Sequence, residues 1–469
     1  MIQSFISLVT RHWISMLGSV IALATAVLMI LLFGMNLSGF KGGPYLGILT
    51  YLLLPAVLLF GLVLIPVGVL RKRSLDAAAV ARHQQVPRLP VIDLNNQHIR
   101  GVVLASVAIA ALAVVLIGSA TYKGVEVMES VAFCGTVCHT VMEPEHTAFQ
   151  RSSHSKLRCA DCHIGEGADW FVKSKISGSW QMVSVAFNLY PTPIPSPVHN
   201  LRPARETCEQ CHWPTKHVGD KLQVFSKFGN DEANSATKTV LLMKVGGQQG
   251  TASTGIHWHV DRGVQIKFLS DPSRQNIYDV HIATADGKER TFKTTEQPTG
   301  PTEWRAMDCV DCHNRPSHTF KMPSAEIDAA LDDGRIDKTL PFIKREGLRI
   351  LDAKYASHEE ARAGIAREVE GFYKANYADI STSKAPAIAA AGKSLGDIYA
   401  WNVFPQMKVT WGTYKSNIGH DDASPGCFRC HDKQHIAADG EKISGSCKLC
   451  HAVLADDEKD PEILKTLKP

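Results

Sequence analysis

The sequence predicts a mainly α-helical and irregular chain, in which three membrane-spanning helices precede a larger external region that contains a small β insertion. Three observations lead to this prediction. Three long apolar segments without charges occupy the first 121 residues. All 12 cysteines follow them, in six pairs that are each followed at once by a histidine. Between these pairs, residues 238–295 alternate apolar and polar side chains, and residues 323–378 show helical periodicity.

Each apolar segment is long enough to cross a bilayer. Residues 13–33, 45–70 and 101–120 contain no charged side chain, and each has at least about 20 residues. A cleaved signal peptide is the alternative for the first segment, but its apolar stretch is too long and no Ala-x-Ala-like site follows it. We therefore expect residues 1–121 to form a three-helix membrane anchor.

The charges around these segments predict their orientation. The loop between the second and third segments carries six cations and two acids: Arg71, Lys72, Arg73, Arg82, Arg88 and Arg100 against Asp76 and Asp93. The positive-inside rule places this loop in the cytoplasm. Two spans precede the loop, so the N-terminus is also expected in the cytoplasm, and everything after Ala120 is expected outside.

Five of the cysteine pairs follow the pattern Cys-x-x-Cys-His, which is the attachment signature of c-type haem. The first pair, Cys134 and Cys138, has three intervening residues. In such sites the thiols form thioethers to the haem and the adjacent imidazole ligates the iron. The sequence thus predicts six covalent haems, at Cys134, Cys138, Cys159, Cys162, Cys208, Cys211, Cys309, Cys312, Cys427, Cys430, Cys447 and Cys450, with proximal ligands His139, His163, His212, His313, His431 and His451.

Zinc knuckles are the alternative interpretation, because paired Cys-x-x-Cys motifs also supply tetrahedral zinc sites. Only 20 of 469 residues are histidine, so a histidine directly after six of six pairs is not chance. The wider gap in the first motif changes how its thioethers reach the ring, so covalent haem attachment at this motif is the one that needs a separate test. The expected fold class is a mainly α and irregular multihaem cytochrome c with three transmembrane helices and a small β insertion.

The charge balance argues against nucleic acid as a partner. The whole chain carries +4, but residues 1–121 hold eight Lys or Arg and two Asp or Glu, which leaves −2 for the external part. Haem propionates would make that part more negative still. A soluble redox protein with a complementary positive face is the better expectation.

Composition divides the external part into segments. The prediction places a haem core with three motifs at 122–230, a β-rich insertion at 231–300, the fourth motif at 301–322, a helical segment at 323–400, and a C-terminal dihaem module and tail at 401–469. Within them, the run from Tyr278 to Lys293 predicts a hairpin with its turn at Asp286-Gly287. Ser357 and Glu360 form a capping-box pattern before an amphipathic helix.

The first four motifs resemble the NapC/NirT family of membrane-anchored multihaem cytochromes, which oxidise quinol at the outer face of the bacterial inner membrane. The resemblance lies in FCGTVCHTVM at 133–142, SSHSKLRCADCH at 152–163, TCEQCH at 207–212 and DCVDCHNRPSH at 308–318. The family core usually has one anchor helix and four haems. Two additional helices and the C-terminal dihaem module would then extend that core, and the haem domain would be periplasmic.

The resemblance also implies axial ligands. By position, His154 corresponds to the distal ligand of the third haem and His318 to that of the second. Met142 corresponds to the methionine that binds the first haem, but it lies one position later than the family spacing, so His139 and Met142 both remain candidates.

A quinol site is expected between the first haem and the membrane, because Cys134 follows the third span by only 14 residues. Quinol oxidation releases protons, which nearby ionisable side chains must accept. The candidates are Glu129, Asp169, Lys173 and Lys175, although each could equally be a solvated charge. The family places a lysine and an acid in this stretch; Lys173 and Lys175 agree with it, whereas Gln181 stands where the acid is expected.

Further histidines are available as distal ligands. His257 and His259 are expected on one face of a strand, one of them as ligand of the fourth haem. His420 and His435 flank the fifth motif and are assigned to the last two haems. His358 is expected at the surface. His146, His199, His217 and His281 are left without an assignment.

The sequence therefore predicts a quinol dehydrogenase that oxidises quinol, with menaquinol the expected substrate, in anaerobic or extracellular respiration. Its partners would be the membrane quinone pool and a periplasmic redox protein. Two alternatives stay open: an electron-relay or anchor subunit of a membrane complex or homo-oligomer, and a multihaem terminal reductase, which would need one haem with an open distal position.

Overall fold

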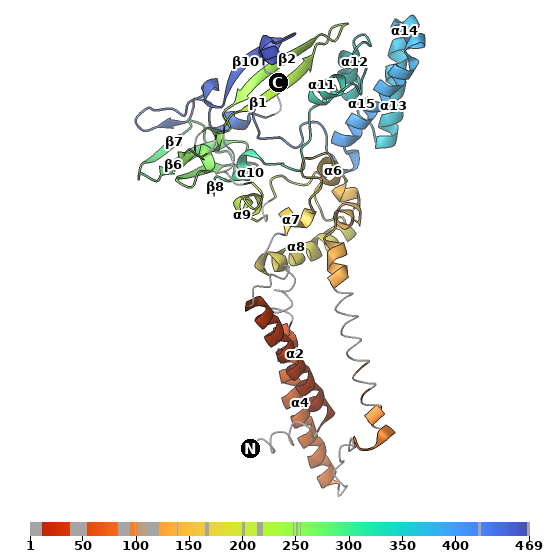
Figure 1. The fold of residues 1–469 in the computed structure, drawn as a ribbon, viewed down its shortest axis with the longest axis vertical. Helices are drawn as coiled ribbons and strands as arrows, with labels where there is room; N and C mark the ends of the chain where they lie inside the picture. Colours follow the sequence, from red (N-terminus) through yellow and green to blue (C-terminus); the bar gives the residue numbers. More distant parts are fainter. Residues whose placement is uncertain are drawn as a thin grey trace. The chain divides into compact units, whose positions relative to one another are not determined.

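The computed structural model describes residues 12–37, 54–82, 94–98, 100–101, 104, 108, 122–137, 139–164, 168–198, 202–212, 219–246, 248–249, 252–253, 255–420 and 424–466. The chain divides into two compact units. The first comprises residues 1–128 and 164–177, and the second comprises residues 129–163 and 178–469. The first unit contains the apolar N-terminal helices (Figure 1), and the residue ranges of the second include all six cysteine pairs.

Two helices among the described residues are long and apolar enough to cross a membrane: α2 (Trp13–Leu37) and α4 (Leu54–Ala81). They pack through small residues. A methyl group added at Gly18 would lie 2.6 Å from the carbonyl oxygen of Gly61, and Ser15 Oγ donates to the carbonyl oxygen of Ile65 at 3.0 Å. Close approach of this kind is how helices associate without a hydrophobic driving force. The third predicted span, 101–120, lies largely outside the described residues.

Short helices carry the first three motifs in the second unit. The extra residue between Cys134 and Cys138 coincides with a π-helical segment, η2 (Phe133–Val137), and a wider helical turn is the usual way to absorb one inserted residue. The other helices of this region are α6 (His139–Gln150), α7 (Cys159–His163) and α9 (Ala204–Cys208), whereas α8 (Ala168–Ala186) begins in the first unit and ends in the second.

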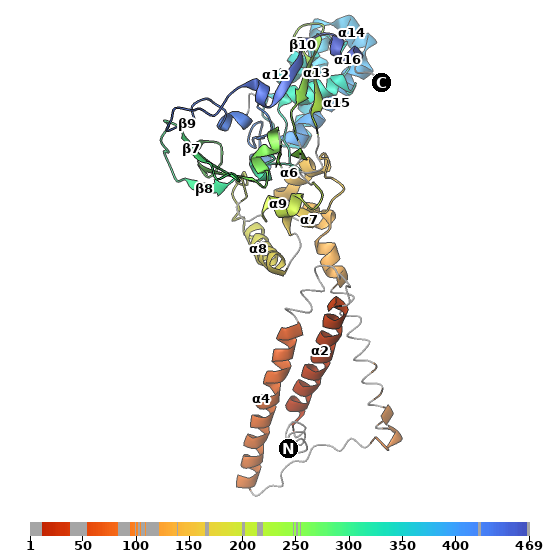
Figure 2. The same cartoon turned by 60° about the vertical axis from the view of Figure 1, so that its left-hand side comes forward.

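Three β-sheets follow. The first has the order β1-β2-β10, the second pairs β3 with β4, and the third has the order β8-β5-β6-β7-β9; every pairing is antiparallel. Figure 2 shows β7, β8 and β9 together and β10 apart from them. The strands are β1 (Lys221–Phe228), β2 (Ala236–Met243), β3 (Gln248–Gln249), β4 (Ala252–Ser253), β5 (Val264–Ser270), β6 (Ile277–Thr284), β7 (Glu289–Lys293), β8 (Glu303–Ala306), β9 (Ile436–Ala437) and β10 (His451–Glu458).

The structure confirms the predicted hairpin, because β6 and β7 pair in antiparallel register, with Ala283 opposite Glu289. It also shows a strand pairing that crosses the predicted boundary at residue 230. β1 begins at Lys221, inside the segment predicted as haem core, and pairs with β2 in the predicted β-rich insertion. Two strands from the C-terminal segment complete the two larger sheets, β9 beside β7 and β10 beside β2. The C-terminal segment is therefore built into the sheets that precede it.

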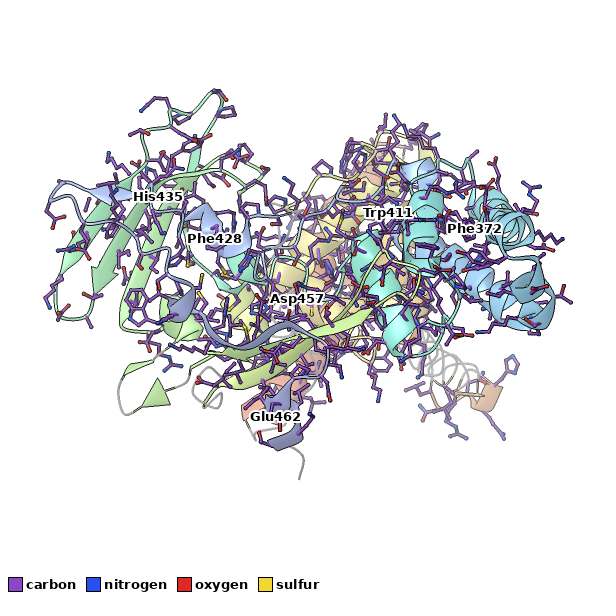
Figure 3. The ribbon with its side chains drawn as sticks, turned by 90° about the horizontal axis from the view of Figure 1, so that it is seen from above. Phe372, Trp411, Phe428, His435, Asp457 and Glu462 are labelled. Carbon is purple, nitrogen blue, oxygen red and sulfur yellow. The ribbon has the colours of Figure 1, made fainter. Side chains whose placement is uncertain are left out.

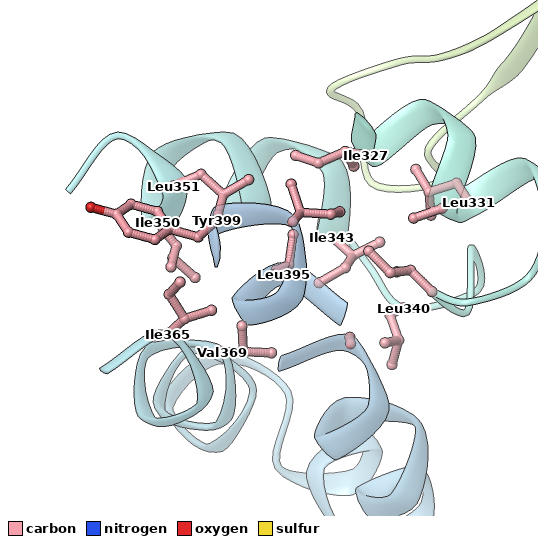
Figure 4. Packing of buried hydrophobic residues seen from close by; sticks show 14 of the residues in the cluster. Ile327, Leu331, Leu340, Ile343, Ile350, Leu351, Ile365, Val369, Leu395 and Tyr399 are labelled. Atoms are coloured by element: carbon pink, nitrogen blue, oxygen red, sulfur yellow. The ribbon is translucent and has the colours of Figure 1, made fainter. Parts of the chain in front are cut away.

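A helical group forms the largest apolar core. Residues such as Ile327, Leu340, Ile365 and Leu395 have no exposed side-chain surface, and their side chains converge between the helices (Figure 4). The helices are α11 (Pro323–Asp332), α12 (Ile343–Leu351), α13 (His358–Asn376), α14 (Ala378–Ser383) and α15 (Ala385–Asn402), followed further along by α16 (Glu462–Thr466). The predicted cap is confirmed, since the Ser357 side chain accepts from the Glu360 backbone N–H at 3.1 Å.

A buried ion pair joins this helical group to the haem-motif region. Arg151, just after α6, places Nη2 2.7 Å from Oε1 of Glu326, whose side chain is 1% exposed. The same guanidinium lies over the ring of Trp401, 4.1 Å from its centroid. Glu326 also accepts from the side-chain amide of Asn402 at 3.3 Å.

We expect Arg151→Ala to lower the thermal unfolding temperature, with a loss of about 3 kcal/mol of stability, because it leaves the buried Glu326 carboxylate without its charged partner. Circular dichroism melts of the holo-protein would measure the effect. Arg362→Ala is the matched control, since its side chain is 52% exposed and that of its partner Asp397 is 21% exposed, against 1% for Glu326. Equal melting temperatures of the Arg151→Ala variant and the parent would contradict the prediction.

Candidate functional site

Five histidine pairs stand out in the second unit. Each pairs the histidine that ends a Cys-x-x-Cys-His motif with a histidine from elsewhere, and the ring centroids lie 5.9 to 6.5 Å apart. Two imidazole nitrogens, each about 2 Å from one metal ion on opposite sides, place the ring centroids roughly 6 Å apart. The pairs are His163 with His318, His212 with His154, His313 with His257, His431 with His259, and His451 with His420.

Backbone carbonyl groups orient several of these rings. His318 Nδ1 lies 3.0 Å from the carbonyl oxygen of Glu145, His259 Nδ1 lies 2.7 Å from that of Ile256, and His431 Nδ1 lies 2.7 Å from that of Ser444. Donation from Nδ1 fixes the tautomer that leaves Nε2 free to bind a metal, which is the usual arrangement of a ligating histidine. Burial lowers the pKa of His259 and so favours the neutral, ligating form.

One distal histidine has a charged second partner. The Glu145 carboxylate lies 3.2 Å from Nδ1 of His318 and is held by Arg315, whose Nη2 donates to both carboxylate oxygens at 2.7 and 2.8 Å. The Arg315 guanidinium in turn lies 4.1 Å from the centroid of the Tyr414 ring. Sequence analysis missed Glu145 and Arg315, which are 170 residues apart and carry no local signal.

The thiols of successive motifs adjoin in sequence order. In three pairs one thiol lowers the pKa of the other: Cys134 lowers that of Cys159, Cys309 that of Cys208, and Cys450 that of Cys427. Burial raises the pKa of Cys162 and of Cys312, and the nearby thiols of Cys208 and Cys427, respectively, act in the same direction. Each motif therefore has the next motif of the chain as its neighbour, and groups attached to them would form a single row.

Cys138 and the side chain of His139 lie outside the described residues, whereas Met142 is half-buried on α6. His146 is close to the first motif, because a methyl group added at Gly135 would lie 2.3 Å from its ring. His146 Nε2 also lies 3.2 Å from Gln150 Nε2. Glycine between the two cysteines thus gives His146 room beside the attachment site.

The structure corrects the predicted setting of His257 and His259. They lie on a 3₁₀-helix, η4 (Ile256–Val260), rather than on a strand. Because 3₁₀ geometry separates residues i and i+2 around the axis, the two rings reach different motifs, His313 and His431. Sequence analysis had expected one ligand here, although the His-Trp-His spacing is a signal that could have suggested two.

His435 has a different environment from the paired histidines. Its side chain is fully buried beside the β6 strand, with Nδ1 3.0 Å from Asp432 Oδ1 and Nε2 3.2 Å from the carbonyl oxygen of Ile277. Both ring nitrogens thus have protein partners. Figure 3 labels His435, which directly precedes β9, and Phe428 on η6 (Gly426–Arg429). His420, by contrast, packs against Phe428 in a tilted arrangement, with the ring centroids 4.6 Å apart.

The quinol-site candidates lie on several elements. Glu129 is buried, with its side chain 3% exposed. Asp169, Lys173 and Lys175 all lie on α8, where Lys173 Nζ is 4.5 Å from the centroid of the Trp170 ring. Among the unassigned histidines, His281 Nδ1 lies 3.0 Å from Thr291 Oγ1, and His199 and His217 lie outside the described residues.

His358 is only partly exposed. Its Nε2 lies 2.6 Å from the carbonyl oxygen of Val403, its Nδ1 lies 3.4 Å from Glu143 Oε1, and its ring contacts Phe404. The expectation of a surface residue therefore misses a structural role: His358 connects the start of α13 to the end of α15 and to α6.

The cysteine pairs, the histidines that follow them and the opposed imidazoles fit covalently bound haem. Together with two apolar helices, they define a membrane-anchored multihaem c-type cytochrome. Residues 96–194 match the NapC/NirT cytochrome c family, N-terminal region. The chain is 39% identical over 457 residues to the cytochrome c-type protein ImcH of Geobacter sulfurreducens, with 96% of this chain and 89% of that protein covered.

This chain belongs to the NapC/NirT cytochrome c family and serves in respiratory electron transfer. No solved structure matches it.

Proposed function

We propose that the protein holds six haems, oxidises quinol beside the first motif and delivers electrons from the sixth motif to a periplasmic acceptor. Bound haem supplies an iron that carries one electron by changing between its ferric and ferrous states. The observation that carries the proposal is the set of five opposed histidine pairs, each including one motif histidine.

Paired imidazoles make the five centres suited to electron transfer. Two histidines on opposite sides of a bound haem iron would leave no position at which a substrate could bind the metal. This favours a protein that transfers electrons from haem to haem over a terminal reductase. We assign the distal ligands as His318, His154, His257, His259 and His420 for the second to sixth motifs; His259 takes the place first given to His435.

A quinol site at the membrane face agrees with the character of α8. Four apolar residues of this helix and the turn after it recur at helical spacing and are highly exposed: Ile176 at 68%, Trp180 at 62%, Val183 at 43% and Phe187 at 71%. A stripe of this kind is typical of a helix that lies in the interfacial region of a bilayer. Lys173 and Lys175 on the same helix are the groups we propose to accept or relay the protons of quinol.

The first motif needs a separate assignment. We retain Met142 and His139 as its candidate ligands, and the proximity of His146 to Gly135 adds a third. Glu129 and Asp169 remain further candidates for proton transfer. In this proposal, the N-terminal helices anchor the chain in the bacterial inner membrane, with the N-terminus cytoplasmic and the haem-bearing unit periplasmic.

Anaerobic stopped-flow mixing of the oxidised, detergent-solubilised protein with a menaquinol analogue tests this function. We expect six haems per chain by pyridine haemochrome assay with intact mass, and rapid growth of the reduced haem bands on mixing. Five haems would mean that the gap between Cys134 and Cys138 prevents attachment. A protein that dithionite reduces but quinol does not would be a relay subunit of a membrane complex instead.

A further inference from the structure

The short 3₁₀-helix η4 contacts several motifs at once. Its two histidines, His257 and His259, lie opposite the histidines of the fourth and fifth motifs. The carbonyl oxygen of Val260, at the end of η4, accepts from Nη2 of Arg205 at 2.7 Å, and Arg205 lies just ahead of the third motif in sequence. The position of this one turn therefore decides whether two haem sites receive their distal ligands.

Backbone hydrogen bonds dock η4 on the segment that follows β2. The N–H of Ile256 donates to the carbonyl oxygen of Lys244 at 2.9 Å, and the N–H of His257 donates to that of Val245 at 3.3 Å. The N–H of Lys244 in turn donates to the carbonyl oxygen of Cys450 at 2.8 Å. The first two residues after β2 consequently join η4 to the sixth motif through main-chain groups.

A second contact holds η4 on the third sheet. Trp258, the residue between the two histidines, packs against the apolar core of this sheet, which includes Ile266, Phe268 and Val280. The turn is therefore held both by this core and by the segment after β2. Because the two histidines flank one anchored residue, a displacement of the turn would move both imidazoles together.

Gly255, which directly precedes η4, has a backbone conformation that other residues rarely adopt. Its φ is 69° and its ψ is −154°, a combination that is essentially restricted to glycine. A methyl group added at its Cα would lie 2.4 Å from the carbonyl oxygen of Lys244 and 2.8 Å from the Cα of Gly246. These are backbone atoms, which cannot swing aside as the end of a flexible side chain can. A larger residue at position 255 would therefore push η4 away from residues 244–246.

We propose that Gly255 is the positioning residue of two haem sites: it lets η4 dock on residues 244–246 and so brings His257 and His259 to the fourth and fifth motifs together. The proposal rests on the proposed ligand assignment and adds a coupling to it, because the two sites share one supporting contact. A single residue separates the two imidazoles, so neither keeps its place when the turn is displaced. A change at Gly255, which is not itself a ligand, therefore opens both sites at once.

Absorption and EPR spectra of the holo-protein, together with carbon monoxide binding, test this coupling. We expect Gly255→Ala to retain six covalent haems and to convert two of them to high spin, whereas His257→Ala and His259→Ala convert one each. A haem iron that has lost one imidazole binds carbon monoxide when reduced, so dithionite-reduced Gly255→Ala should bind two more equivalents per chain than the parent. Added imidazole should return both haems to low spin, because it fills the open position without moving η4.

Gly287→Ala is the matched control. Gly287 also has a positive φ, of 79°, in the turn between β6 and β7, but a methyl group added there meets no described atom within 4 Å. We expect its spectra and its carbon monoxide binding to equal those of the parent. The same result for Gly255→Ala would overturn the proposal, and so would conversion of only one haem, which would show that the two ligands move independently. Conversion of two haems in both glycine variants would also overturn it, since a general loss of stability would then be the cause.

A second variant decides the question if Gly255→Ala loses covalent haem. Ile256→Pro removes the N–H that donates to Lys244 and adds no group at residue 255, and proline suits the first position of a helical turn. We expect partial conversion of the same two haems, and an unchanged spectrum would contradict the proposal. Unchanged spectra in His257→Ala and His259→Ala would reject the ligand assignment and the proposal with it. Slow reduction of the parent by quinol would count against quinol oxidation alone and leave these measurements valid.

Discussion

His318→Ala, His154→Ala and His259→Ala should each convert one low-spin haem to high spin while the number of covalent haems stays at six. Each change removes one of two opposed imidazoles, so the iron keeps only its motif histidine. Electronic absorption and EPR spectra of the oxidised protein would measure the conversion. Stability should fall as well, because each metal-mediated link ties segments that are distant in sequence.

His435→Asn is the matched control for this series. His435 is a buried histidine close in sequence to the fifth motif, but both of its ring nitrogens have protein partners. We therefore expect its replacement to preserve every low-spin signal. A high-spin haem in His435→Asn together with an unchanged spectrum in His259→Ala would reverse the ligand assignment at the fifth motif.

Removal of the first attachment site, by Cys134→Ala with Cys138→Ala, should abolish rapid reduction by quinol and leave five haems that dithionite still reduces. We expect the initial rate in stopped-flow mixing to fall at least tenfold, because a two-electron, two-proton donor must meet an electron acceptor that has proton-accepting groups beside it. Only the first motif follows the predicted third span closely in sequence.

The complementary variant removes the sixth attachment site, at the C-terminal end of the row of motifs. Cys447→Ala with Cys450→Ala should retain rapid reduction by quinol and slow the delivery of electrons to a soluble c-type cytochrome. Point changes are preferable to truncation here, because β10 begins at His451 and pairs with β2, while Tyr414 packs in a core with Phe404. If the variant without the sixth attachment site lost rapid reduction by quinol, and the variant without the first site kept it, the quinol site would lie beside the sixth motif instead.

The segments predicted from the sequence make extensive contacts with one another in the folded second unit. β9 and β10 extend the sheets formed by residues 221–306, and Arg429 bonds to the backbone of the fourth motif. Arg151 and His358 connect the helical group to α6 on the other side. Of these contacts, the hydrogen bond from Arg429 to the carbonyl of Asp311 joins the fifth motif directly to the fourth.

The attachment motifs and several local structures of this protein could be predicted from the sequence alone, because they depend on the spacing of residues close together in the chain. The two cysteines of a motif and the histidine after them occupy five or six consecutive residues, so each motif can be recognised in the sequence without knowledge of the fold. The apolar spans, the β6–β7 hairpin and the Ser357 cap are local in the same sense. Family membership followed from the context of the first four motifs.

Only the tertiary structure decided which histidine opposes which motif. The opposed imidazoles come from positions far along the chain, as His259 does opposite His431, and a sequence with many histidines admits many pairings. The 3₁₀ turn that separates His257 from His259 is likewise set by its surroundings. The same holds for Arg429, whose side chain donates to the backbone carbonyls of Arg274 and Asp311, since no short-range pattern encodes contacts made across more than 100 residues.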